Sequence, residues 1–428
     1  MPTAPKKVIQ GWAMYDWANS VYNLVITTTF FPAYYAAVTS LKNFPDGISF
    51  LGRRFVNTEL KDYVLAFGFL IIALISPILS SIADYKGNKK NFMRFFCYLG
   101  ATSCSLMFLF DSDHITLGLM CFMFAGIGFY GSQVFYNSYL PDIAAEEDMD
   151  RISARGYTMG YIGSVLMQMV GFALVMFMED KQMALKITFL LVGIWWVGFA
   201  QFTFSRLPSI PKKERQARRH VLVNGFHELT LVFRQVRTMP VLKRFLGAFF
   251  FYNMGVQTVM LVAIDFGIKE LKLPDDRLII VAVMIQLVAI AGALLISKLS
   301  SVYGNLRVLL FTVLLWIGVC ITGYYVQSET HFYILGGLVG LVMGGIQSLS
   351  RSTYSKLMPE TRDTASFFSF YDVTEKLAIV IGLFTFGFIE GISSIRNSIL
   401  SLIIFFVIGF IILMLTEHKQ RSEKNKSI

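Results

Sequence analysis

The stretch LIIVAVMIQLVAIAGALLISKL, residues 278–299, decides the class of fold. Its first charged residue is Lys298, close to its end. A helix that crosses a membrane needs about 20 mostly apolar residues. Because backbone polar groups in hydrocarbon must be satisfied within the segment, a run of this length is a helix and not a strand. The stretch therefore predicts a transmembrane helix.

Eleven more apolar runs of similar length lie before and after this stretch. They are residues 12–37, 63–82, 92–110, 116–139, 153–178, 184–204, 245–268, 306–326, 332–357, 366–389 and 397–415. Only 15% of the residues are charged and 55% are hydrophobic, whereas soluble domains carry about a quarter charged residues. The sequence predicts an all-α integral membrane protein with twelve transmembrane helices.

The basic residues indicate how these helices are oriented. Most of the 38 lysines and arginines lie at the N-terminus, in alternate loops and in the C-terminal tail. Lysine and arginine favour the cytoplasmic side of a membrane protein, so we expect both termini in the cytoplasm and a multi-pass protein of the inner membrane. The net charge of +10 comes from the basic residues in these loops, where they set the orientation of the helices. We therefore expect no nucleic-acid partner.

The longest predicted cytoplasmic connection divides the chain. We expect a six-helix bundle at 1–204, a basic linker at 205–244, a second six-helix bundle at 245–415 and a cytoplasmic tail at 416–428. The linker holds a basic cluster, which is Lys212, Lys213, Arg215, Arg218 and Arg219. Apolar residues then recur at helical spacing, at Leu222, Phe226, Leu229, Phe233 and Val236. This pattern predicts an amphipathic helix on the inner membrane surface.

The two predicted bundles repeat each other weakly. Gly87-Asn88 follows the second helix and Gly304-Asn305 follows the eighth. Further pairs match at one constant spacing: Arg151, Ala154, Gly171, Phe177 and Glu179 correspond to Arg362, Ala365, Gly382, Phe388 and Glu390. Parallel six-helix repeats describe the major facilitator architecture.

The loop at residues 84–90 resembles the major facilitator loop signature. Asp84, Gly87 and Lys90 match the signature in kind. In that superfamily the loop latches the outward-facing state, so the resemblance implies a conformational latch here. The alternative is an ordinary short turn with basic residues on the cytoplasmic side.

Polar side chains form stripes on four of the predicted helices. On the first helix, the polar residues fall within an arc of about 100°, and they are Asp16, Asn19, Ser20, Asn23 and Thr27. The other three stripes are Tyr130, Gln133, Tyr136 and Asn137; Tyr252, Asn253 and Gln257; and Gln347, Ser350, Arg351 and Tyr354. The resemblance implies that these helices line a substrate cavity. The alternative is polar contacts that hold neighbouring helices together.

The eleventh helix carries three charged residues, Asp372, Glu375 and Lys376. Asp372 and Lys376 are four residues apart and can form an ion pair. We hypothesise that Glu375 binds a coupling proton or a substrate amine, the alternative being a static buried ion network. Arg351 could bind a substrate carboxylate, gate against an acid of a neighbouring helix, or extend to the inner headgroups.

Several other patterns do not indicate a cofactor or catalytic site. Gly126, Gly128 and Gly131 spell a nucleotide fingerprint, but they lie inside an apolar run with no strand before it, so we expect them to allow close helix packing. The four cysteines lie in apolar runs and are expected to be core residues. We expect no metal, no cofactor and no enzymatic activity.

Four stretches carry a more specific resemblance. They are Tyr15 to Ser20, Tyr252 to Thr258, Gly344 to Ser352, and Phe368 to Lys376. They resemble the vacuole-effluxer-like branch of the major facilitators, which includes the fungal autophagy-related vacuolar amino-acid exporter and many bacterial members. The long loops of the fungal members are missing, which indicates a compact bacterial member. The resemblance implies a secondary transporter that exports neutral amino acids or related small metabolites.

Two other functions remain open from the sequence. A lipid flippase on the same scaffold would need a polar groove that opens sideways to lipid. A nutrient sensor that does not transport would need a soluble signalling surface, for which only 205–244 is available. For the transporter we expect a small-molecule substrate, protons as a possible coupling ion, and a monomer.

Overall fold

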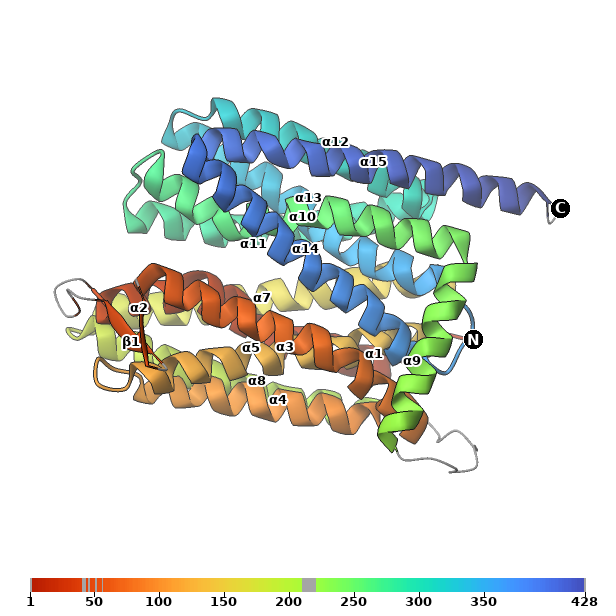
Figure 1. Ribbon diagram of the computed structural model, residues 1–428, viewed down its shortest axis with the longest axis horizontal. Helices are drawn as coiled ribbons and strands as arrows, with labels where there is room; N and C mark the ends of the chain where they lie inside the picture. The colour runs from red at the N-terminus through yellow and green to blue at the C-terminus, as the bar shows by residue number, and fades with distance from the viewer. Residues whose placement is uncertain are drawn as a thin grey trace. The chain divides into compact units, whose positions relative to one another are not determined.

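The computed structural model of the chain describes residues 2–40, 44, 47–50, 52–55, 57–209 and 221–426. In this part of the chain the secondary structure is helical apart from one short hairpin (Figure 1). The basic cluster predicted at 212–219 lies outside the described residues.

The first elements follow the predicted runs closely. They are α1 (Lys6–Val21), the π-helix η1 (Tyr22–Phe30), α2 (Phe31–Val38), β1 (Ile48–Phe50), β2 (Arg53–Phe55), α3 (Asn57–Lys86), α4 (Lys89–Leu106), η2 (Met107–Leu109), α5 (Ile115–Ser138), α6 (Leu140–Ile143), η3 (Glu146–Asp148), α7 (Met149–Phe177) and α8 (Lys181–Arg206). Strands β1 and β2 pair antiparallel, with Ile48 opposite Phe55. The sequence analysis predicted neither this hairpin nor the π-helical middle of the first run.

The remaining elements are all α-helices. They are α9 (Val221–Thr238), α10 (Pro240–Lys269), α11 (Asp275–Tyr303), α12 (Asn305–Tyr325), α13 (Glu329–Leu357), α14 (Thr364–Ile392) and α15 (Ile395–Lys426). Helix α10 begins before the predicted residue 245 because Pro240 suits the first turn of a helix, and Lys243 and Arg244 continue the helix beyond its apolar part.

Ten helical stretches in the described residues are long and apolar enough to cross a membrane. All twelve predicted runs fall on helical structure to within a residue at their ends. Two of the twelve predicted runs are not among these ten helices. In the first run, the π-helix η1 interrupts the α-helix. In the eleventh run, α14 carries the charged residues Asp372, Glu375 and Lys376.

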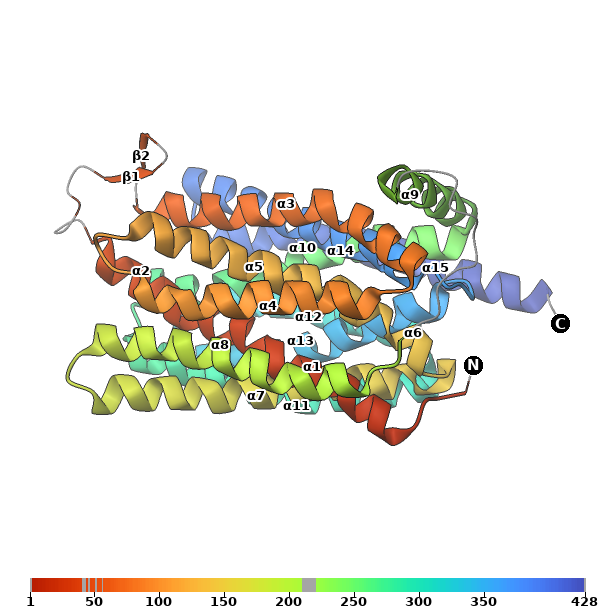
Figure 2. The ribbon, with the colours of Figure 1, turned by 90° about the horizontal axis from the view of Figure 1, so that it is seen from below.

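The chain divides into two compact units, each of which has its own core. The N-terminal unit contains Lys6–Tyr136 and Met159–Lys213, and the C-terminal unit contains Met1–Pro5, Asn137–Thr158 and Glu214–Ile428. In the N-terminal unit, α4 packs along α8 (Figure 2). In the C-terminal unit, α15 packs along α10 and α12 (Figure 1). Helices α5 and α7 each contribute residues to both units.

Small residues determine how closely the helices approach. Gly336, Gly340 and Gly344 recur every four residues on α13, and a Cβ atom at Gly344 would lie 2.1 Å from the carbonyl oxygen of Ala289 on α11. The fingerprint-like glycines of α5 behave as the sequence analysis expected, since a Cβ atom at Gly128 would lie 2.4 Å from the Cα atom of Gly100 on α4. Close helix packing explains them.

Two glycines make the equivalent turns in the two halves of the sequence. Gly87 ends the turn between α3 and α4 with φ 64°, and Gly304 connects α11 to α12 with φ 85°. Residues with a side chain adopt this left-handed region at a cost, so the matched Gly-Asn pairs reflect a shared backbone requirement.

Replacing Gly87 with alanine is expected to destabilise the protein by about 1 kcal/mol, because alanine must adopt the left-handed conformation. The measurement is the thermal unfolding midpoint of the purified protein in mild detergent. Gly198→Ala is the control, since a Cβ atom there meets nothing within 4 Å and alanine favours the helix. Equal midpoints for Gly87→Ala and the unmodified protein would show that the turn does not need glycine.

Candidate functional site

The polar stripe of α1 meets the polar stripe of α5 inside the N-terminal unit. The Tyr136 hydroxyl donates a hydrogen bond of 2.7 Å to Oδ2 of Asp16, whose side chain is almost fully buried. The indole of Trp12 stacks on the Tyr136 ring at 4.6 Å and donates from Nε1 to the Tyr136 carbonyl oxygen at 3.0 Å. Asp16 is therefore held in a rigid aromatic setting within the protein, and not at a solvated helix end.

One turn along α1, Asn19 is fully buried, and neither its amide oxygen nor its amide nitrogen has a hydrogen-bond partner in the described residues. Buried polar groups are almost always paired, so an unpaired carboxamide calls for a functional explanation. A further turn along, Asn23 accepts a hydrogen bond of 3.3 Å from the Tyr130 hydroxyl. Gln133 lies between Tyr130 and Tyr136 in sequence and is half-buried.

The middle of this first run is a π-helix, Tyr22–Phe30. Stretches of π-helix are rare and occur frequently at functional sites. Thr28 and Thr29 both donate to the carbonyl oxygen of Leu24, and Gln168 of α7 donates to Thr29 at 3.2 Å. One signal that could have indicated this irregularity is the run of three threonines at 27–29.

The charged cluster of α14 lies in the C-terminal unit and also engages α10. Lys376 is buried and forms ion pairs with Asp372 at 2.9 Å and with Glu375 at 3.2 Å. Gln257 of α10 donates from Nε2 to Oε1 of Glu375 at 3.1 Å. The side chain of Glu375 is 26% exposed, against 5% for Asp372 and 2% for Lys376. Glu375 is thus the most exposed member of the cluster.

The polar residues of α10 continue this cluster. Gln257 also donates to Oδ1 of Asn253 at 3.4 Å, and the amide nitrogen of Asn253 is buried without a hydrogen-bond partner in the described part of the chain. Tyr252 shares a hydrogen bond of 2.8 Å with Ser350 of α13. On α13, Gln347 makes a 3.5 Å contact with the sulfur of Met260. The stripes of α10, α13 and α14 therefore meet inside one unit.

Arg351 is buried to 1% exposure, so its extension to the headgroups, one of the three predicted alternatives, is wrong. It donates from Nε to Oγ of Ser153 at 3.0 Å, and from a terminal nitrogen to the Ser153 carbonyl oxygen at 2.8 Å. A third bond of 3.1 Å reaches Oδ1 of Asn137, and the guanidinium lies 4.3 Å from the centre of the Tyr157 ring. Arg351 therefore fixes the segment 137–158 to α13.

The sequence analysis missed a second set of contacts, made by Asp150, that holds the segment 137–158 against neighbouring helices. The buried carboxylate of Asp150 accepts hydrogen bonds from Ser300 of α11 at 2.8 Å, Asn305 of α12 at 2.7 Å and Lys356 of α13 at 2.7 Å. Lys356 also donates to Asn305 at 3.0 Å. The repeated Gly-Asn pair singled out Asn305 in the sequence, but nothing in the sequence connected it to Asp150.

The predicted latch residues make contacts within the N-terminal unit. Asp84 and Lys89 form a buried ion pair at 3.5 Å. Lys90 donates to the carbonyl oxygens of Phe204 and Leu207, at 3.0 and 2.7 Å. These carbonyls close the carboxyl end of α8, where a cation is favourable. The latch function of Asp84, Gly87 and Lys90 stays a prediction.

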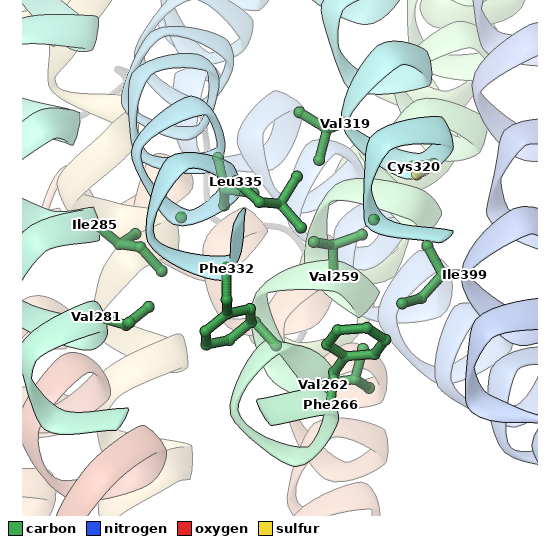
Figure 3. A pocket seen from close by; sticks show the side chains of 14 residues that line it. Val259, Val262, Phe266, Val281, Ile285, Val319, Cys320, Phe332, Leu335 and Ile399 are labelled. Carbon is green, nitrogen blue, oxygen red and sulfur yellow. The ribbon is translucent and has the colours of Figure 1, made fainter. Parts of the chain in front are cut away.

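An apolar pocket opens among α10, α11, α12, α13 and α15 of the C-terminal unit (Figure 3). Its lining includes Val259, Phe266, Ile285 and Phe332, and Gly323 and Gly336 leave space in it. Its lining side chains are all apolar, and solute sites need a few polar groups to fix orientation. The polar clusters are for this reason the better candidates for a solute site.

The described residues form ten apolar helical stretches of membrane-crossing length, with buried polar clusters on them, an arrangement typical of multi-pass membrane transporters. Solved structures of that class share the fold of this chain. The fucose:proton symporter FucP of Escherichia coli aligns with a TM-score of 0.70 at 14% identity, over 96% of this chain and 97% of that one. The human organic anion transporter MFSD10 aligns with a TM-score of 0.71 at 12% identity, over 95% and 98%.

Sequence relatives define the family. The model of the family described as "Vacuole effluxer Atg22 like" matches residues 4–426, and the chain belongs to this family. The MFS-type transporter YxiO of Bacillus subtilis is 32% identical over 94% of this chain and 93% of its own length. Autophagy-related protein 22 of Kluyveromyces lactis is 24% identical over 96% and 93%. The protein is a major-facilitator-type transporter, and its relatives are transporters and not enzymes.

Proposed function

We propose that the protein is a secondary active transporter that exports amino acids or related small metabolites by alternating access. The polar clusters supply the chemistry for a small zwitterion. In the N-terminal unit, the carboxylate of Asp16 suits an ammonium group and the amide of Asn19 suits hydrogen bonding to a carboxylate or a side chain. In the C-terminal unit, Glu375 suits an ammonium group in the same way, and Asn253 and Gln257 supply the amides. Two of these amides have buried atoms without a partner in the described residues, which supports a role in binding solute.

We propose that the chain spans the inner membrane twelve times and that both termini lie in the cytoplasm. Within the described part of the chain, ten helices meet the requirements of a span. The segment from α1 to α2 and helix α14 supply the other two, because buried polar and charged groups are tolerated in spans at functional positions. The excess of lysine and arginine on one set of loops supports the orientation, and the transporter is proposed to act as a monomer.

The position of Glu375 is the single observation that carries the proposed coupling. Each of its two oxygens accepts a hydrogen bond, one from the neutral Gln257 amide and the other from the charged Lys376 ammonium group. Asp372 and Lys376 neutralise each other, so Glu375 adds one negative charge when ionised. A proton or a substrate ammonium group on Glu375 removes that charge. Glu375 is therefore proposed to exchange a proton for the substrate amine.

Replacing Glu375 with glutamine is expected to abolish the dependence of transport on a pH gradient, because the amide cannot take up or release a proton. The measurement is uptake of a radiolabelled amino-acid panel into proteoliposomes that hold the purified protein, with and without an imposed gradient. The unmodified protein should show saturable uptake that the gradient stimulates.

Glu390→Gln is the matched control, because Glu390 lies on the same helix but pairs with Lys269 at 2.8 Å near its other end. It should retain gradient-dependent uptake. Normal transport with an unchanged pH dependence in Glu375→Gln would disprove the coupling role. If the unmodified protein takes up no amino acid under any gradient, amino acids are not its substrates, and lipids become the first class to test.

A further inference from the structure

Helix α9 lies crosswise to α10, beside the end at which α10 begins (Figures 1 and 2). Helices α10 and α15 are of membrane-crossing length and composition. A helix that runs across the ends of membrane-crossing helices is parallel to the membrane surface. The sequence analysis predicted such a position for this segment from its apolar periodicity.

The apolar face of α9 is only partly available to lipid. Val232 and Val236 are buried, and α9 contacts α10 and α14. The ring of Phe233 lies 6.1 Å from that of Phe370 on α14, nearly parallel to it. Val236, which the sequence analysis placed on the apolar face, therefore packs inside the protein. The position of the helix on the membrane stays a prediction. The side chains of Leu222, Phe226 and Leu229 lie outside the described part.

The opposite face is basic. Arg234 and Arg237 of α9 are exposed, as is Lys243 near the start of α10, and residues 230–244 contain no acidic residue. The Arg237 guanidinium lies 5.9 Å from the centre of the Phe233 ring, and Phe233 itself is 48% exposed. An exposed aromatic ring beside arginines on a helix parallel to the membrane is the pattern of a segment that inserts between headgroups. Arginine binds phosphate through two parallel hydrogen bonds.

We propose that Phe233, Arg234, Arg237 and Lys243 form a surface that binds the phosphate headgroup of an anionic phospholipid. The lipid holds α9 against the membrane while Val232 and Val236 hold it against the bundle. The stacked Phe233 and Phe370 rings connect this surface to α14, two residues before Asp372. Bound lipid therefore stabilises the packing of the helix that carries the charged cluster.

Native mass spectrometry of the purified full-length protein tests lipid binding directly. The unmodified protein should retain phosphatidylglycerol at lower added concentrations than phosphatidylcholine. Each arginine near an anionic lipid surface contributes to the binding free energy. The double variant Arg234→Ala/Arg237→Ala should therefore bind phosphatidylglycerol about thirty-fold more weakly than the unmodified protein. Lys86→Ala/Lys298→Ala removes the same charge at exposed positions of other helices and should bind as the unmodified protein does.

A second measurement tests the effect on packing. All four cysteines are buried, so a thiol-reactive dye reports unfolding. Phosphatidylglycerol should raise the unfolding midpoint of the unmodified protein and not that of the double arginine variant. Equal affinity for the two lipids, or an unchanged affinity in the arginine variant, would overturn the proposal. Neither measurement uses transport, so its failure would leave the proposed function standing.

Discussion

Replacing Lys376 with methionine is expected to abolish transport and to destabilise the protein by about 3–5 kcal/mol. Lys376 is 2% exposed and lies within ion-pair distance of both Asp372 and Glu375. Without the ammonium group, two carboxylates one turn apart on α14 face each other in a buried setting. Removing one partner of a buried pair is far more costly than removing both, because the other charge stays without compensation.

The double variant Asp372→Asn/Lys376→Met separates stability from function. It removes the buried pair as a neutral unit, so its unfolding midpoint should return most of the way to that of the unmodified protein. Transport should stay impaired, because Glu375 loses the cation that binds its second oxygen. The measurements are the unfolding midpoint in detergent and uptake into proteoliposomes. A single Lys376→Met variant as stable as the unmodified protein would contradict the buried ion network.

Replacing Gly344 with leucine is expected to prevent α11 and α13 from packing together. A Cβ atom at this position would lie 2.1 Å from the Ala289 carbonyl oxygen and 2.9 Å from the carbonyl carbon. These are backbone atoms of a helix, so they cannot rotate aside as a side chain does, and the two helices must separate. Overpacking of this kind exceeds the usual cost of about 1–3 kcal/mol, and little folded protein should be recovered.

Gly337→Leu is the control on the same helix, since a Cβ atom there meets nothing within 4 Å. It should give a monodisperse peak on size-exclusion chromatography, and Gly344→Leu should give aggregate. Gly340→Leu should behave as Gly344→Leu does, because its Cβ atom would lie 2.5 Å from the Ile285 carbonyl oxygen. A monodisperse Gly344→Leu protein with an unchanged unfolding midpoint would show that the two helices are not in close contact.

The helices were predictable from sequence because apolarity along a chain is a local property. Each predicted run lies on helical structure, although helices such as α3 and α15 continue beyond the apolar part into charged residues. A hydropathy pattern cannot show where a helix ends in water, since hydrogen bonding and not apolarity sets that end. The π-helix within the first run was missed for a related reason, because the spacing of its backbone hydrogen bonds leaves no trace in hydropathy.

The candidate site was predictable in part. The ion pair between Asp372 and Lys376 followed from their spacing of four residues on one helix, and it forms at 2.9 Å. The contact between Glu375 and Gln257 joins two helices far apart in sequence, and no local pattern could have shown it. The functions of these residues stay predictions.

The sequence by itself determined that this protein is helical, lies in a membrane and belongs to a transporter family, because composition and motifs are carried by neighbouring residues. Only the tertiary structure decided the partners of Asp150 and Arg351, two buried charges that bind residues far away in the sequence. Asp150 takes its hydrogen bonds from three helices, and Arg351 binds residues near 137 and 153. A buried charge must find its partners wherever the fold brings donors and acceptors together, and these partners lie 150 to 214 residues away along the chain.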